Sequence, residues 1–199
     1  MAQQGLPNHV GTAMAVPPDN ATHVNMSRLD NIRPTWVRDK TTAIWTTGLS
    51  DCVAVATYNM KTHFRSLTHL PGGQFTAGWA QELAGDIDKY TIVIVANGTA
   101  ALALDRFHDS VFVPIMNVLK LALGGRVAAQ YWMYCTPEAM GGPARPPNDM
   151  MMHSFVLLPD GTFGRAGGPA SVKAQWPVTK VQDPVVRDPH PAKGLNTLG

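Results

Sequence analysis

The chain has 199 residues, of which 45% are apolar and 15% are charged, a composition typical of a folded globular protein rather than a disordered, highly charged one. Its formal net charge is only +2, and its basic residues form no runs with interleaved aromatics, so charge favours neither nucleic acid nor an anionic membrane as a partner. No apolar stretch reaches the roughly 18 residues needed to span a bilayer.

Three regions of the chain differ in composition. Residues 1–33 contain several prolines and no apolar periodicity, so they are predicted to form a loosely ordered N-terminal arm in which His23 is a solvated surface residue. Residues 34–166 carry the apolar segments and are predicted to form one domain. Residues 167–199 are again rich in proline and are predicted to form a tail.

The predicted elements of the domain alternate between strands and helices. Residues 35–47 are expected to form a strand or hairpin, followed by strands at 53–58 and 62–69. A helix is expected after Thr76, whose hydroxyl suits an N-cap. The later elements are a strand at 90–96, a helix at 111–123, strands at 126–134 and 154–158, and a proline- and glycine-rich loop at 136–150 that can frame a cleft. This order predicts a mixed α/β (α+β) fold, a sandwich of mixed sheets flanked by helices.

The turn that precedes Cys52 is the most informative stretch of the sequence. Gly48 permits backbone angles that other residues resist, and Ser50 and Asp51 favour turns through local hydrogen bonds. An apolar strand follows the cysteine directly. The backbone N–H groups of this turn are therefore candidates to bind an oxyanion.

Histidines of the next predicted strand can activate this thiol. A period of two places His63 and His69 on one face of a strand that covers residues 62–69. A free thiol, with a pKa of roughly 8.5, is only slightly ionised at neutral pH, and an adjacent imidazole both lowers that pKa and accepts the proton. Spacing alone also fits a buried, inert cysteine, which is the more common use of a free thiol.

The chain has only one other cysteine, Cys135, at the end of a predicted strand. A disulfide between Cys52 and Cys135 would exclude a nucleophilic role for Cys52. The N-terminal residues lack a basic segment followed by an apolar one, so a classical secretion signal is not expected, and two cysteines in such a chain favour two free thiols.

Thr46, Cys52 and His69 resemble the Thr/Cys/His constellation of bacterial protein glutamine deamidases. In the chemotaxis-receptor deamidases of the CheD family, a threonine lies six residues before the cysteine, and a histidine followed by Leu-Pro lies seventeen residues after it. The present sequence has the same spacings and continues with Leu70-Pro71.

The same stretch is also similar to the Thr…Leu-Ser-Gly-Cys signature of the Burkholderia lethal factor toxins and of cytotoxic necrotizing factor. Leu49-Ser50 and Cys52 match that signature, whereas Asp51 replaces its glycine. The resemblance covers about residues 42–73, and the later glycine-rich motifs of the chemotaxis enzymes are missing. It therefore points to a toxin or effector relative.

The resemblance implies a deamidase domain over residues 34–166 that hydrolyses a glutamine side chain of a protein. Cys52 would be the nucleophile, His69 the base, and Thr46 the residue that orients His69, with His63 as the alternative base. The turn that contains Gly48, Ser50 and Asp51 would hold the oxyanion, and neither a metal nor an organic cofactor is required.

The implied partner is a protein that carries a reactive glutamine, such as a small GTPase or a translation factor of a host, or a signalling receptor. The resemblance also implies a protein made in the bacterial cytoplasm and exported without a classical signal peptide to act in host cytosol. Two other classes remain open: a cysteine protease or transglutaminase, and a non-catalytic interaction module in which Cys52 is inert.

Overall fold

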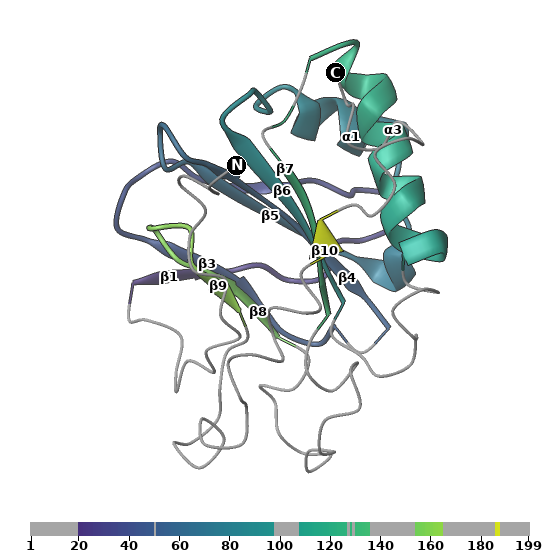
Figure 1. The fold of residues 1–199 in the computed structure, drawn as a ribbon. Helices are drawn as coiled ribbons and strands as arrows, with labels where there is room; N and C mark the ends of the chain where they lie inside the picture. The colour runs from purple at the N-terminus through teal and green to yellow at the C-terminus, as the bar shows by residue number, and fades with distance from the viewer. Residues whose placement is uncertain are drawn as a thin grey trace.

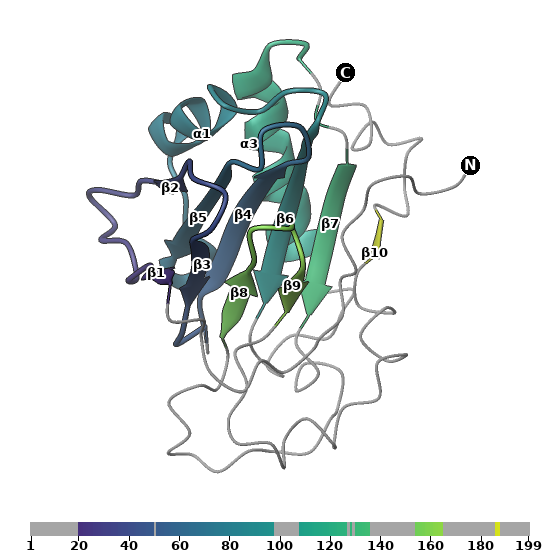
Figure 2. The same cartoon turned by 90° about the vertical axis from the view of Figure 1, so that its left-hand side faces the viewer.

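Two mixed β-sheets pack face to face, and two helices cover the outer face of the larger sheet (Figure 1). The structure is a computed structural model that describes residues 20–49, 51–97, 108–126, 128, 130–135, 154–164 and 186–187. In this part of the chain the predicted mixed α+β fold is confirmed. The smaller sheet lies in front of the larger one in Figure 2, with the helices on the far side.

The larger sheet has six strands in the order β10-β7-β6-β4-β5-β2. All neighbouring strands in it are antiparallel except β6 and β7, which are parallel. The bounds are β2 Thr35–Val37, β4 Val53–Asn59, β5 Arg65–Leu70, β6 Thr91–Asn97, β7 Gln130–Cys135 and β10 Val186–Arg187.

The smaller sheet has four strands in the order β1-β3-β8-β9. Strands β1 and β3 are parallel, and the other pairs are antiparallel. The bounds are β1 Ala21–His23, β3 Ala43–Thr46, β8 Phe155–Leu157 and β9 Phe163–Gly164.

The central strand β4 separates two hydrophobic cores. Val53 and Val55 point towards the helices, whereas Ala54 and Ala56 point towards the smaller sheet. Because side chains alternate along a strand, β4 has to be apolar on both faces, and all seven of its residues are buried. The face towards the smaller sheet also contains Cys52.

Helix α1 (Ala77–Ala84) begins at the residue expected to cap it. The Thr76 hydroxyl oxygen accepts a hydrogen bond from the Trp79 backbone N–H at 3.1 Å, so the N-cap prediction is confirmed. The buried Trp79 indole donates to the Thr68 hydroxyl of β5 at 3.0 Å. The cap and the indole together fix the start of α1 on the larger sheet.

Helix α3 (Val113–Leu123) begins two residues later than predicted, because residues 108–112 form a π-helical turn. Each buried residue lies three or four positions from another, as a helix packed on one face requires, and Gly124 ends the helix in the left-handed conformation. The buried residues are Ile115, Met116, Leu119 and Leu123.

Two short strands lie in regions predicted to be an arm and a tail. Strand β1 pairs with β3, and strand β10 pairs with β7. Strands of two or three residues have no apolar periodicity, so the sequence gives no sign of them. Residues 1–19, the predicted loop at 136–150 and most of the predicted tail lie outside the described residues.

A buried arginine joins the two sheets at the end of β5 opposite His69. The Arg65 guanidinium is fully buried and donates hydrogen bonds to the carbonyl oxygens of Asp39 at 2.9 Å, Thr42 at 2.6 Å, His63 at 2.5 Å and Pro159 at 3.4 Å. Thr42 leads into β3, and Pro159 follows β8. Arg65 therefore connects the larger sheet to two segments of the smaller one.

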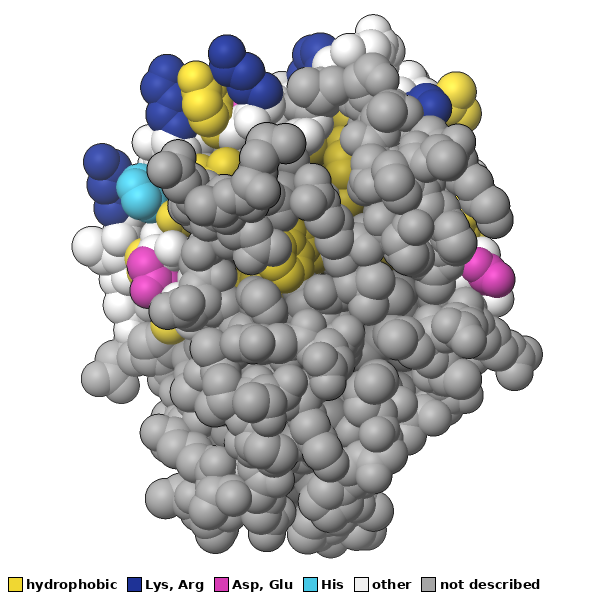
Figure 3. Space-filling model, in the orientation of Figure 1, with side chains coloured by type: hydrophobic (Ala, Val, Ile, Leu, Met, Phe, Trp, Pro, Cys, Tyr) yellow, Lys and Arg dark blue, Asp and Glu magenta, His cyan; other side chains and the backbone are white. Residues whose placement is uncertain are grey.

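The surface carries charge of both signs. In Figure 3, lysine and arginine side chains of the described residues gather along the upper edge of the face shown, with acidic groups at its sides. Among the described residues, no helix combines the length and apolar character needed to cross a membrane.

Candidate functional site

Strands β4 and β5 bring Cys52 and His69 to the same face of the larger sheet. His69 lies directly opposite Ala54 in the register of the two strands. Cys52 precedes Ala54 by two residues and belongs to the same buried cluster. Diagonal neighbours of this kind are about 7–8 Å apart, within reach of longer side chains. The structure thus brings together the two residues predicted as nucleophile and base.

Thr46, from β3 of the smaller sheet, fixes the orientation of His69. Its hydroxyl oxygen lies 2.8 Å from His69 Nδ1 and 2.6 Å from the Val24 carbonyl oxygen. A hydroxyl has one hydrogen to donate, and a carbonyl can only accept, so the Thr46 hydrogen goes to Val24. The Thr46 oxygen therefore accepts from the Nδ1–H of His69, and the neutral ring carries its lone pair at Nε2.

The surroundings of His69 keep the ring neutral. Its side chain is 3% exposed. Burial lowers its pKa, with a smaller contribution from the charge of His23, to about 4. Nε2 is buried and has no hydrogen-bond partner among the described residues. A buried polar atom without a partner is costly to a fold, which makes this nitrogen a candidate functional group.

Cys52 is a free thiol that contacts a methionine rather than the imidazole. Its side chain is 9% exposed, and its Sγ donates to Met26 Sδ at 3.6 Å. Met26 lies in the loop between β1 and β2 and is itself 57% exposed. Sequence reasoning missed Met26 because it lies in the predicted arm, far from Cys52 along the chain.

The turn before Cys52 has the backbone conformation expected of its glycine. Gly48 has a φ of +75°, which favours glycine. Leu49 is fully buried and anchors the turn, while Asp51 is exposed. Ser50, the remaining residue of the expected oxyanion turn, lies outside the described residues, as does the side chain of Cys135.

His63 lies far from this site. Strand β5 begins at Arg65, so His63 belongs to the hairpin turn after β4 rather than to the strand face of His69. The length of β4 separates it from Cys52, roughly 20 Å at the usual rise per residue. Its Nδ1 lies 2.7 Å from the Tyr58 hydroxyl. The structure therefore does not bring the predicted alternative base to Cys52.

His23, predicted to be a solvated surface residue of a loose arm, is exposed but belongs to strand β1. It lies in β1 opposite Trp45, with the two ring centroids 4.5 Å apart, and its Nε2 is 3.5 Å from the Thr47 hydroxyl. The charge of His23 contributes to lowering the pKa of His69, so β1 influences the electrostatics of the site.

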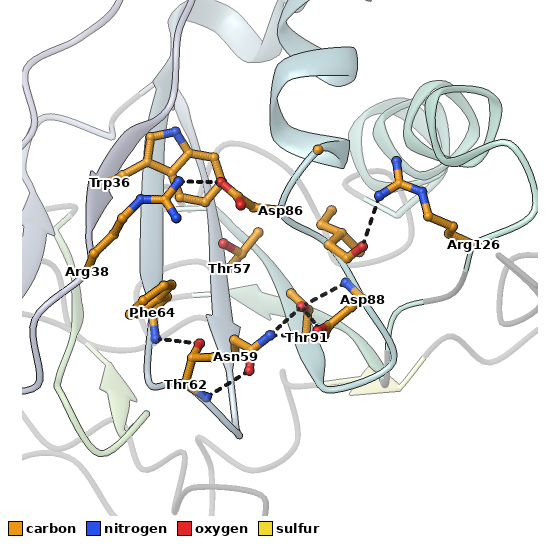
Figure 4. A pocket seen from close by; sticks show the side chains of 12 residues that line it. Trp36, Arg38, Thr57, Asn59, Thr62, Phe64, Asp86, Asp88, Thr91 and Arg126 are labelled. Carbon is orange, nitrogen blue, oxygen red and sulfur yellow. Dashed lines mark hydrogen bonds and ion pairs between the residues drawn. The ribbon is translucent and has the colours of Figure 1, made fainter.

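A cavity of about 330 Å³ lies on the other face of the larger sheet, beside β2 and the loop after α1 (Figure 4). The Arg38 guanidinium lies 5.3 Å from the Trp36 ring centroid and 5.4 Å from that of Phe64, and it pairs with Asp86 at 2.7 Å. The cation–π contacts and the ion pair already satisfy this guanidinium.

The polar floor of the same cavity is also paired internally. Asp88 accepts hydrogen bonds from Asn59 at 2.9 Å and from Thr91 at 3.0 Å, as Figure 4 shows. The cavity contains none of the residues predicted for the thiol site. We therefore assign the candidate reactive centre to Cys52, His69 and Thr46 and not to this cavity.

Comparisons with known proteins give no family for the chain. No family model matches the sequence, and no curated protein matches it. Among solved structures, a Neisseria meningitidis protein of the family DUF152 is 14% identical, with a TM-score of 0.26. The match covers 38% of this chain and 34% of the Neisseria protein, so this chain spans about a third of that protein's length. A likeness this weak carries no argument about fold or function.

Proposed function

We propose that the chain is a cysteine-dependent amidohydrolase that converts glutamine side chains of a protein to glutamate. One observation carries this proposal: the Thr46–His69 hydrogen bond leaves a buried Nε2, without a partner among the described residues, on the sheet face that also contains Cys52. A nucleophile, a base and a group that orients the base are the three parts that thiol catalysis requires.

The reaction follows from these roles. His69 Nε2 takes the Cys52 thiol proton, and the thiolate attacks the carboxamide carbon of the glutamine. The imidazolium returns its proton to the departing nitrogen, so ammonia leaves and a thioester remains. Water then hydrolyses the thioester and releases glutamate and the free thiol. Backbone N–H groups around Asp51 and Cys52 would stabilise the oxyanion, each by roughly 3 kcal/mol.

The biological setting rests on the resemblance of Thr46, Cys52 and His69 to the glutamine deamidases. It supports a toxin or effector that is made in a bacterial cytoplasm and acts on a host protein, such as a small GTPase or a translation factor. The proposed chemistry uses no metal and no organic cofactor.

Three other reactions or roles would use the same residues. A cysteine protease would cut a peptide bond through the same thioester, and a transglutaminase would transfer the glutamine acyl group to an amine instead of water. In a non-catalytic interaction module, the largely buried Cys52 would be an inert core residue.

The test is ammonia release from a cell lysate incubated with the purified chain, with mass spectrometry of the lysate proteins. We expect conversion of specific glutamines to glutamate, and complete loss of this activity in Cys52→Ala.

Thr46→Val keeps the shape of the side chain but removes the acceptor for the His69 Nδ1–H, so activity should fall at least tenfold, whereas Thr46→Ser should retain most of it. His63→Ala is the matched control and should stay active.

The products separate the alternatives. Cleaved peptide bonds would identify a protease, and incorporation of an added primary amine in preference to hydrolysis would identify a transglutaminase. If a biological effect of the chain persists unchanged in Cys52→Ala, the protein is an interaction module and the proposal is wrong.

A further inference from the structure

The thiol and the base of the candidate site are not bonded to each other. Cys52 donates its S–H to the sulfur of Met26, while His69 Nε2 has no partner among the described residues. A single S–H cannot be donated to both acceptors at once. In this arrangement the Cys52 proton, which the reaction must transfer to His69, is therefore donated to Met26 instead.

The position of Met26 allows its side chain to move while its backbone stays fixed. The Val24 N–H donates to the Trp45 carbonyl at 2.8 Å, and the Ser27 N–H donates to the His69 carbonyl at 3.0 Å, so both sides of Met26 are tied to neighbouring strands. The side chain between these ties is 57% exposed. Methionine has an unbranched, flexible side chain, and its thioether is a weak acceptor that is easily exchanged for a better one.

We propose that Met26 is a positioning residue of the site: it holds the Cys52 thiol away from His69, and entry of the substrate displaces it so that the thiol turns to Nε2. This inference rests on the proposed thiol chemistry. In the absence of substrate the thiol is 9% exposed and lies against the exposed Met26 side chain. Once Met26 is displaced, the S–H is free to be donated to the imidazole Nε2 on the same sheet face, which has no other partner among the described residues.

The test is the alkylation rate of Cys52 in the full chain by iodoacetamide, measured against pH, with peptide mapping to separate Cys52 from Cys135. Met26→Leu removes the sulfur acceptor at nearly constant volume, and Met26→Ala removes both acceptor and cover. We expect both variants to react at least threefold faster at pH 7, with the pH midpoint of the reaction lowered. Leu29→Ala is the matched control, because Leu29 is 55% exposed in the same loop, and its rate should equal that of the wild type.

The role of His69 is tested by repeating the series in a His69→Gln background, where the acceleration in Met26→Leu should disappear. If Met26→Leu reacts like the wild type, Met26 is at most a steric cover, and if it accelerates equally without His69, its loss does not turn the thiol to His69. Either result overturns the inference. Ammonia release reports separately on the proposed function. An active deamidase whose Met26 variants alkylate normally refutes the inference alone, whereas His69-dependent alkylation without ammonia release refutes the deamidase and leaves the role of Met26 intact.

Discussion

At the scale of single residues, the burial of His69 affects stability as well as reactivity. Its pKa in the folded protein is about 4, whereas an exposed histidine of the unfolded chain has a pKa of about 6.5. As the pH falls below 6.5, the unfolded chain binds this proton first, so the equilibrium shifts towards unfolding. The stability that depends on a neutral His69 is therefore complete above pH 6.5 and is lost between pH 6.5 and 4.

This difference predicts a pH dependence that a single substitution removes. Between pH 7 and 4.5, the wild type should lose about 2 kcal/mol of unfolding free energy through His69 alone. His69→Gln cannot titrate, so its loss over the same range should be smaller by that amount. Urea unfolding of both proteins at the two pH values measures the difference. Equal losses in the two proteins would show that folding does not lower the pKa of His69.

The sequence pointed to Cys52 and His69 of the candidate site more readily than to the residues that contact them. Cys52 and His69 lie on the two arms of one hairpin, at its open end, so the pairing of two consecutive strands is enough to bring them together. Val24 and Met26 reach the same site from a loop whose position depends on how the two sheets pack. Nothing in the local sequence encodes such contacts, which is why a hydrogen-bond acceptor and a sulfur neighbour were both missed.

At the scale of elements, the hydroxyl of Thr76 is the side-chain group that caps the start of α1. Thr76→Ala leaves the Trp79 N–H without its acceptor and should lower the free energy of unfolding by about 1 kcal/mol. Thr76→Ser keeps a hydroxyl at the same position and should cost much less. Thermal unfolding followed by circular dichroism measures both, and an unchanged midpoint in Thr76→Ala would contradict the cap.

Elements marked by an apolar run or a capping residue were predicted from the sequence. Short strands that form only by pairing with a distant strand were not. The apolar run at 90–96 and the threonine cap of α1 correspond closely to β6 and the observed N-cap. In contrast, His63 was placed on a strand face because alternation continues through residues that actually form a turn. The φ of +62° at His63 reflects the closure of this hairpin, which periodicity does not reveal.

At the scale of the whole molecule, Arg65 is the residue whose loss should affect both sheets. Arg65→Met removes the guanidinium and leaves carbonyl oxygens in two layers without their donor, so unfolding free energy should fall by at least about 3 kcal/mol. Arg38→Met is the control, because the Arg38 side chain is half exposed and its pair is on the surface. Urea unfolding measures both, and similar small losses would mean that Arg65 does not join the layers.

The strand pairings also imply an order of events during folding. Strands β4 and β5 are joined by a short hairpin, whereas β3 pairs with β8 across more than half of the chain, as Ile44 lies opposite Leu157. Closing a short loop costs less entropy and takes less time than closing a long one. The hairpin that carries Cys52 and His69 should therefore form before the smaller sheet covers it. During this interval the thiol faces water, so a newly made chain passes through a stage in which oxidants and alkylating agents reach Cys52 more readily than in the folded protein, where Cys52 is 9% exposed.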